Sequence, residues 1–175
     1  MSKSIETFAA QRVSYTTDLP VYEVLKRLDA AVNRDSEKNI VRSIRSARTP
    51  KELELRVREV AGDDFGFFFE FNHSNWLKMY LGSDDVPEMH VYTIGNPILA
   101  QSMLKHRPAS GLYVPLRLMV MGRYADSNRG TVVVYDLPSS MIATDGEGEL
   151  RDAAVVLDHK LEALVQEVTS AMCRV

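Results

Sequence analysis

Residues 91–121 constrain the fold more than any other stretch, because they place two strands around a short helix with almost no linking chain. A β-rich run ends at Ile94 and Gly95. Asn96 is a preferred helix N-cap and Pro97 a preferred first helical residue. Pro108 and Gly111 then end the helical unit before a second alternating run begins. The stretch therefore predicts a strand, a helix over 97–106 and a returning strand.

The hydrophobic pattern of the remaining chain predicts an α+β fold. Alternating or β-rich runs predict strands at 12–17, 65–73, 89–94, 112–124 and 131–135. Helical spacing of apolar residues predicts helices from Pro20 to about Val32, within 35–48, from Thr49 to Gly62, over 75–81 and over 149–173. Because the strands are joined by hairpins or short helices, we expect one domain over 1–175. It has a mainly antiparallel sheet, helices on one face and a long C-terminal helix. Residues 35–62 are expected to be a helical insertion within this domain. At the helix start within it, we expect the Thr49 side chain to accept from the Glu52 amide while Glu52 reaches back to the Thr49 amide. Residues 126–130 are expected to form a turn, and residues 136–148 a loop.

Composition narrows the class of function. The chain has 175 residues and a formal net charge of −3, which gives no support for nucleic-acid binding. It has no apolar run near the length of about 20 residues that crosses a bilayer, and no secretory h-region at the start. Its single cysteine, Cys173, has no partner for a disulfide or a metal site. We therefore expect a cytoplasmic protein without a metal, a cofactor, a nucleic-acid partner or a membrane partner.

Strand alternation predicts a half-apolar second face of the sheet. If Phe65, Phe67, Phe69 and Phe71 face the helices, then Glu70 points the other way. The same argument for the strand after Gly111 sends Arg117 to that second face. The residues expected there are Phe68, Glu70, Asn72, Tyr113, Arg117, Met119 and Tyr135. Such a surface suits a shallow ligand pocket or a dimer interface. Arg117 would bind a carboxylate, either that of a ligand or that of Glu70 in a purely structural ion pair.

His73 and Asn96 are further candidates near this face. A helix N-terminus such as that at Asn96 can hold an anion, although an asparagine followed by proline also serves as a simple cap. His73 could act as a general base, but the sequence assigns it no nucleophile. The histidines lack metal-ligand spacing.

Four blocks resemble one known family. They are Phe65–Phe67 through Asn72–His73, the turn Ile94–Pro97, the run Gly111–Arg117, and Tyr135–Ser140. In order and spacing they are similar to the Domain of Unknown Function 302 family over about residues 12–165. The resemblance implies a compact α+β fold and a homodimer, and it supplies no reaction or catalytic residue.

We therefore expect a non-catalytic, dimeric domain that binds a small, partly apolar or anionic ligand. The ligand-binding candidates are Glu70, His73, Asn96, Arg117, Phe68, Tyr113 and Met119. Two alternatives stay open. One is a small enzyme in which His73 and Glu70 transfer protons, and the other is a structural dimerisation module without a ligand.

Overall fold

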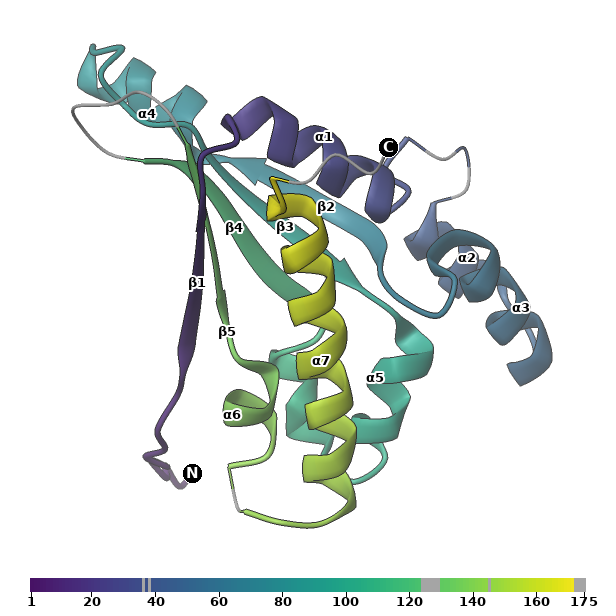
Figure 1. Cartoon of the computed structure of the whole chain (residues 1–175). Coiled ribbons are helices and arrows are strands. Elements are labelled where there is room, and N and C mark those ends of the chain that lie inside the picture. Colours follow the sequence, from purple (N-terminus) through teal and green to yellow (C-terminus); the bar gives the residue numbers. More distant parts are fainter. Residues whose placement is uncertain (36, 38, 124–129, 145, 172–175) are drawn as a thin grey trace.

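A five-stranded antiparallel sheet in the order β1-β5-β4-β3-β2 forms the centre of the molecule, so the predicted α+β architecture is confirmed (Figure 1). The structure is a computed structural model and describes residues 1–35, 37, 39–123, 130–144 and 146–171. Its elements are β1 (Arg12–Thr17), α1 (Val21–Ala31), α2 (Ile40–Ser46), α3 (Pro50–Ala61), β2 (Gly66–Asn72), α4 (His73–Leu81), β3 (Met89–Gly95), α5 (Pro97–Leu104), the 3-10 helix η1 (Pro108–Leu112), β4 (Leu116–Gly122), β5 (Thr131–Asp136), α6 (Pro138–Ile142) and α7 (Glu149–Thr169).

Two of the predicted elements differ in detail from those in the structure. The strand expected at 112–124 begins only at Leu116, because Pro108 opens the 3-10 helix η1 and carries the chain through Leu112. The segment after β5, expected to be a loop, contains the short helix α6. Parts of two expected features, residues 126–129 of a turn and residues 172–173 of the last helix, lie outside the described residues.

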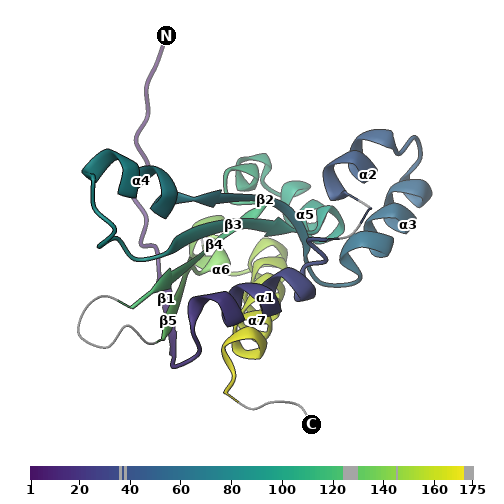
Figure 2. The ribbon, with the colours of Figure 1, turned by 90° about the horizontal axis from the view of Figure 1, so that it is seen from above.

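Helices α1 and α7 cover one face of the sheet, and the main core lies between them and the strands (Figures 1 and 2). Leu118 and Val120 of β4 and Tyr92 of β3 are fully buried there, as are Leu28 of α1 and Leu161 of α7. These positions follow the predicted alternation in β4 and the predicted apolar stripe of α7. Among the described residues, no helix packs across the other face, which we call the open face (Figure 2).

A β-bulge in β2 places the side chains that follow it on the opposite face of the sheet from the one expected. Phe67 pairs with Ile94 and Phe69 pairs with Thr93, so Phe68 is an extra residue between them. The alternation of side chains is inverted beyond this point. Phe67 faces the helices, whereas Phe69 and Phe71 lie on the open face and are 56% and 46% exposed. The prediction that all four phenylalanines share the helix-covered face is therefore wrong.

Helices α2 and α3 form a hairpin with a small core of its own beside the β2 end of the sheet (Figure 1). Ile40, Val57 and Val60 are buried in it, and Phe68 packs against them from the bulge. The predicted cap is present, since the Thr49 side chain accepts a hydrogen bond from the Glu52 amide. Glu52 itself accepts from the Arg48 amide rather than from that of Thr49. Whether residues 35–62 are an insertion stays a prediction.

Candidate functional site

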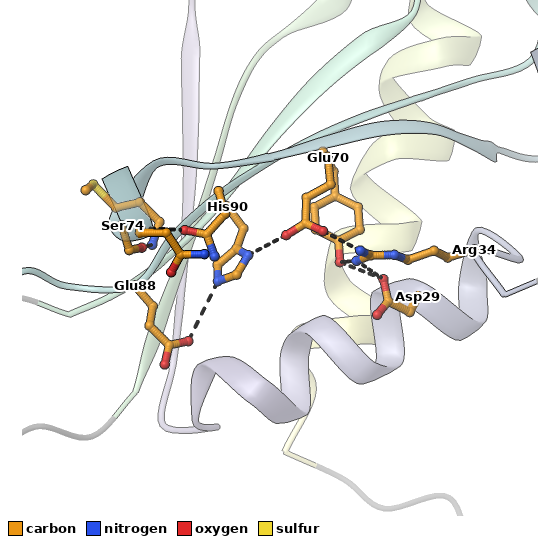
Figure 3. Close-up of polar contacts among 10 residues, drawn as sticks. Asp29, Arg34, Glu70, Ser74, Glu88 and His90 are labelled. Atoms are coloured by element: carbon orange, nitrogen blue, oxygen red, sulfur yellow. Dashed lines mark hydrogen bonds and ion pairs between the residues drawn. The ribbon is translucent and has the colours of Figure 1, made fainter. Parts of the chain in front are cut away.

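A chain of charged side chains lies between β2, β3 and the end of α1, on the helix-covered side of the sheet (Figure 3). Glu70 is at its centre. One carboxylate oxygen of Glu70 lies 2.5 Å from Nδ1 of His90, and the other lies 2.5 Å from a guanidinium nitrogen of Arg34. Arg34 also donates to Asp29 at 3.2 Å and to the Tyr92 hydroxyl at 2.6 Å. The Tyr92 hydroxyl in turn donates to Asp29 at 2.6 Å.

Burial and charge pairing set the protonation of this network. Burial alone would raise the pKa of Glu70, but the hydrogen bond to His90 and the positive charge of Arg34 outweigh it and lower that pKa. Burial together with the Asp29 hydrogen bond raises the pKa of Tyr92. Glu70 is therefore an anion whose two oxygens are both engaged by protein groups. This arrangement matches a structural ion pair better than a ligand-binding carboxylate.

Glu70 and Arg117 lie on opposite faces of the sheet, so the expected pair does not form. Arg117 pairs with Thr93 in the register of β4 and β3, and Thr93 pairs with Phe69 on the open face. Glu70 instead pairs with Tyr92, which is fully buried under the helices. The cause is the bulge at Phe68, which moves Glu70 to the covered side. The expectation that Tyr135 shares the second face is wrong too, since Tyr135 is 4% exposed and packs in the main core.

The structure gives Glu70 a different histidine from the one expected. His73 begins α4, where its ring contacts Phe71 at 4.8 Å between centroids and accepts a hydrogen bond from the Trp76 indole at 3.3 Å. His90, which sequence reasoning had not selected, is the histidine that meets Glu70. Its other nitrogen, Nε2, lies 3.8 Å from Glu88. The predicted proton-transfer pair of His73 and Glu70 is therefore not present in the described structure.

A mainly apolar cavity of about 210 Å³ lies near the start of β2, where β2, β3, β4, α2, α5 and α7 meet. Its lining contains two of the predicted ligand residues, Phe68 and Asn96. Helix α2 contributes Ile44 and helix α7 contributes Leu157. The remaining lining comes from the residue before β2, the β3–α5 turn, α5, and the chain that leads into the first residue of β4: Phe65, Gly95, Pro97, Ala100, Met103, Leu104, Val114, Pro115 and Leu116.

Asn96 is the polar side chain of this lining, and its hydrogen bonds stay within the protein. Its oxygen accepts from the Ile98 amide at 2.9 Å, which caps α5 as predicted. Its amide nitrogen donates to the carbonyls of Asp64 at 3.0 Å and Gly62 at 3.4 Å. These bonds tie the β3–α5 turn to the segment that follows α3. The cavity therefore offers a ligand hydrocarbon contact and very little hydrogen bonding.

The remaining predicted residues are divided between two places. Met119 lies on the open face with Arg117, between Val91 and Val134 of the neighbouring strands. Tyr113 follows η1 and lines a separate small cavity beside Arg107. The seven candidates thus do not form one site. Asp29, Arg34 and His90 were missed because only the fold brings them to Glu70. By contrast, Gly66 was an available signal for the bulge, because glycine in a strand often marks one.

Comparison with known proteins agrees with this architecture. The family model described as "Domain of unknown function DUF302" matches residues 42–168, and the chain belongs to this family. A crystal structure of an uncharacterized conserved DUF302 protein from Bacillus stearothermophilus is similar, with a TM-score of 0.62 and 15% sequence identity. The match covers 91% of this chain and 98% of that one. At this identity the likeness concerns the fold. No curated protein matches the chain. Among the described helices, none is long and apolar enough to cross a membrane.

Proposed function

We propose that this chain binds a small, partly apolar ligand whose hydrocarbon part occupies the cavity between Phe68, Asn96 and Leu157. The volume of that cavity carries the proposal. Small-molecule sites are typically concave and mostly apolar, and this cavity, which is partly open to solvent, has that form. An apolar cavity of about 150 Å³ in another protein binds benzene. At about 210 Å³, the cavity here has room for a ligand of benzene size or somewhat larger.

The lining also limits the chemistry of the ligand. It contains no charged side chain, and the amide of Asn96 is already bonded within the protein. A buried carboxylate or ammonium group would lose its hydration there without gaining a partner. The ligand is therefore bound through its apolar part, and any polar group it carries stays at the cavity mouth. Binding without chemistry is the role that this lining supports.

Calorimetric and thermal-unfolding titrations with toluene test the proposal. Toluene at about 100 times its dissociation constant should stabilise the wild-type protein by about 2.7 kcal/mol. Ala100→Leu places three extra carbons in the cavity and should abolish this gain. Ala163→Leu, on an exposed position of the neighbouring helix α7, is the matched control and should respond as wild type does. Equal toluene responses from all three proteins, or none from the wild type, would exclude the cavity as the site.

A second proposal concerns the open face, whose central residues are apolar. Val91, Met119 and Val134 lie side by side on β3, β4 and β5. Phe69 and Phe71 extend this apolar surface to the edge strand β2, next to Trp76 of α4, which is 44% exposed. Large exposed apolar patches on soluble proteins mark interaction sites. We propose that a second copy of the chain covers this face.

The size of the face suits such a dimer. Five strands about 4.8 Å apart, with six or seven residues each rising about 3.3 Å, give a footprint of about 500 Å². Two copies packed face to face would then bury at least about 1,000 Å², which is near the lower limit for a specific interface. A two-fold arrangement makes the patch its own partner, as most homodimers do.

Sedimentation of two lysine variants tests the dimer. Met119→Lys puts a charge at the centre of the open face, whereas Val156→Lys puts the same charge on α7, where Val156 is 50% exposed. We expect a dimer for the wild type and for Val156→Lys, and a monomer for Met119→Lys. A specific interface of this size should have a dissociation constant below about 100 μM. A wild-type protein that is still monomeric at that concentration therefore speaks against the pairing.

A further inference from the structure

A second, smaller cavity of about 100 Å³ lies against η1 and contains polar groups that the proposed ligand site does not use. Its polar lining consists of Arg107, Ser110, Tyr113, Thr144 and Glu6. Glu6 belongs to the N-terminal segment 1–11, which has no helix or strand. The apolar side chains around it are Phe8, Ala109, Leu112, Met141 and Ile142.

The carboxylate of Glu6 forms part of the cavity wall, where it makes two long contacts. Its Oε1 atom accepts from a guanidinium nitrogen of Arg107 at 3.3 Å and from the Thr144 hydroxyl at 3.3 Å. Arg107 itself donates to Thr144 at 2.9 Å. Charge-assisted hydrogen bonds of this type are usually about 2.7–2.9 Å long. Glu6 therefore reaches the Arg107 guanidinium without the close contact that a well-fitted carboxylate makes.

Ser110 supplies a second, independent indication of a ligand. It lines the same cavity, is 1% exposed, and its hydroxyl is the one buried side-chain polar atom among the described residues that has no hydrogen-bond partner. Leaving such a group unpaired is unfavourable, because the water that it loses on burial is not replaced by another hydrogen-bond partner. A small acceptor held beside Arg107 would satisfy the Ser110 hydroxyl as well.

We infer that this cavity is a binding site for a short-chain monocarboxylate, and that the carboxylate of Glu6 in the N-terminal segment competes with it in cis for Arg107. The guanidinium of Arg107 suits a carboxylate because it presents paired donors in one plane. The cavity volume equals that of about three water molecules, which is the size of a two- or three-carbon acid. The surrounding methionine, isoleucine and phenylalanine side chains suit the alkyl part. This inference does not depend on the larger apolar cavity.

Because Glu6 belongs to the same chain as the cavity, its carboxylate competes with a free acid for Arg107. A segment attached a few residues away is present at millimolar effective concentration, so it reduces the apparent affinity for a free acid in proportion to its occupancy. Gln11 holds the end of this segment through hydrogen bonds to Ser140 and Leu137. Removing the Glu6 charge should therefore expose the site without moving the rest of the fold.

Titration of the full chain with sodium propionate at constant ionic strength, followed by ¹H–¹⁵N NMR, tests the inference. We expect Glu6→Ala to bind propionate with a dissociation constant about ten-fold lower than wild type. The shift changes should centre on Arg107, Ser110 and Thr144. Propionamide, which has the same shape and no charge, should leave the spectra unchanged.

Two further variants make the result decisive. Adding Arg107→Ala to Glu6→Ala should remove propionate binding, while Thr7→Ala, one position along the same segment, should behave as wild type does. Equal affinity in the wild type and Glu6→Ala would overturn the in cis competition. Binding that survives the loss of Arg107, or a Glu6→Ala protein that does not respond to propionate, would overturn the site itself.

Discussion

Glu70 illustrates how one residue can be fixed in a single protonation state by its surroundings. Its pKa is lowered in the folded protein, so it stabilises the fold above the unfolded-state value of about 4.3 and loses this effect as the pH falls below it. We therefore expect Glu70→Gln to reduce the free energy of unfolding by about 1–3 kcal/mol at pH 7, because Arg34 and His90 lose a charged partner.

Urea unfolding between pH 3 and pH 7 measures this effect. The difference between the wild type and Glu70→Gln should shrink as the pH falls through 4, while Glu54→Gln, an exposed position on α3, should stay near wild type throughout. A Glu70→Gln penalty that is the same at pH 3 and pH 7 is inconsistent with an ionised Glu70.

Gly66 is the residue that lets the α2–α3 hairpin approach the sheet. A methyl group on Gly66 would lie 2.8 Å from Cδ1 of Ile40 and 3.2 Å from Cβ of Ala61. Gly66→Ala should therefore destabilise the protein by about 1–3 kcal/mol through overpacking. Ile40→Val removes the nearer atom, so the double variant should recover part of the loss in a double-mutant cycle. Strictly additive losses would contradict this contact.

At the scale of elements, one substitution can separate the two roles of Asn96, which caps α5 and also ties the β3–α5 turn to the segment after α3. Asn96→Asp keeps the capping oxygen but cannot donate to the carbonyls of Gly62 and Asp64. We expect it to cost about 1–2 kcal/mol, close to the cost of Asn96→Ala. Thr49→Asp, which changes a cap that only accepts, should stay near wild type. Thermal or urea unfolding of the three variants measures these differences. If Asn96→Asp were as stable as wild type, the hydrogen bonds donated by Asn96 would contribute nothing and its role would be capping alone.

The sequence was also most informative about the fold at the level of its helices and strands. Local signals such as Thr49-Pro50 and Asn96-Pro97 placed the helix starts of α3 and α5 correctly. The faces of β4 followed from alternation because that strand is regular. Alternation failed in β2 because the single extra residue Phe68 inverts every later side chain. The same inversion separated Glu70 from Arg117, and so the expected site could not be built from periodicity.

At the scale of the whole molecule, the two proposed functions use separate surfaces. The apolar cavity lies where α2, α5 and α7 meet the end of β2, whereas the open face is centred on Met119. Because they share no residue, we expect Met119→Lys to leave the toluene dissociation constant within about two-fold of wild type. Calorimetry on the monomeric variant measures this directly. Loss of toluene binding on conversion to the monomer would mean that dimerisation completes the cavity.

The most direct test of the apolar cavity is a crystal structure of the protein under xenon pressure. Xenon enters dry apolar cavities of this size and scatters strongly enough to be located without ambiguity. We predict a xenon atom between Phe68, Ala100 and Leu157, and none there in crystals of Ala100→Leu. A wild-type crystal in which Phe68 or Ile44 fills that space, with no xenon bound, would contradict the account.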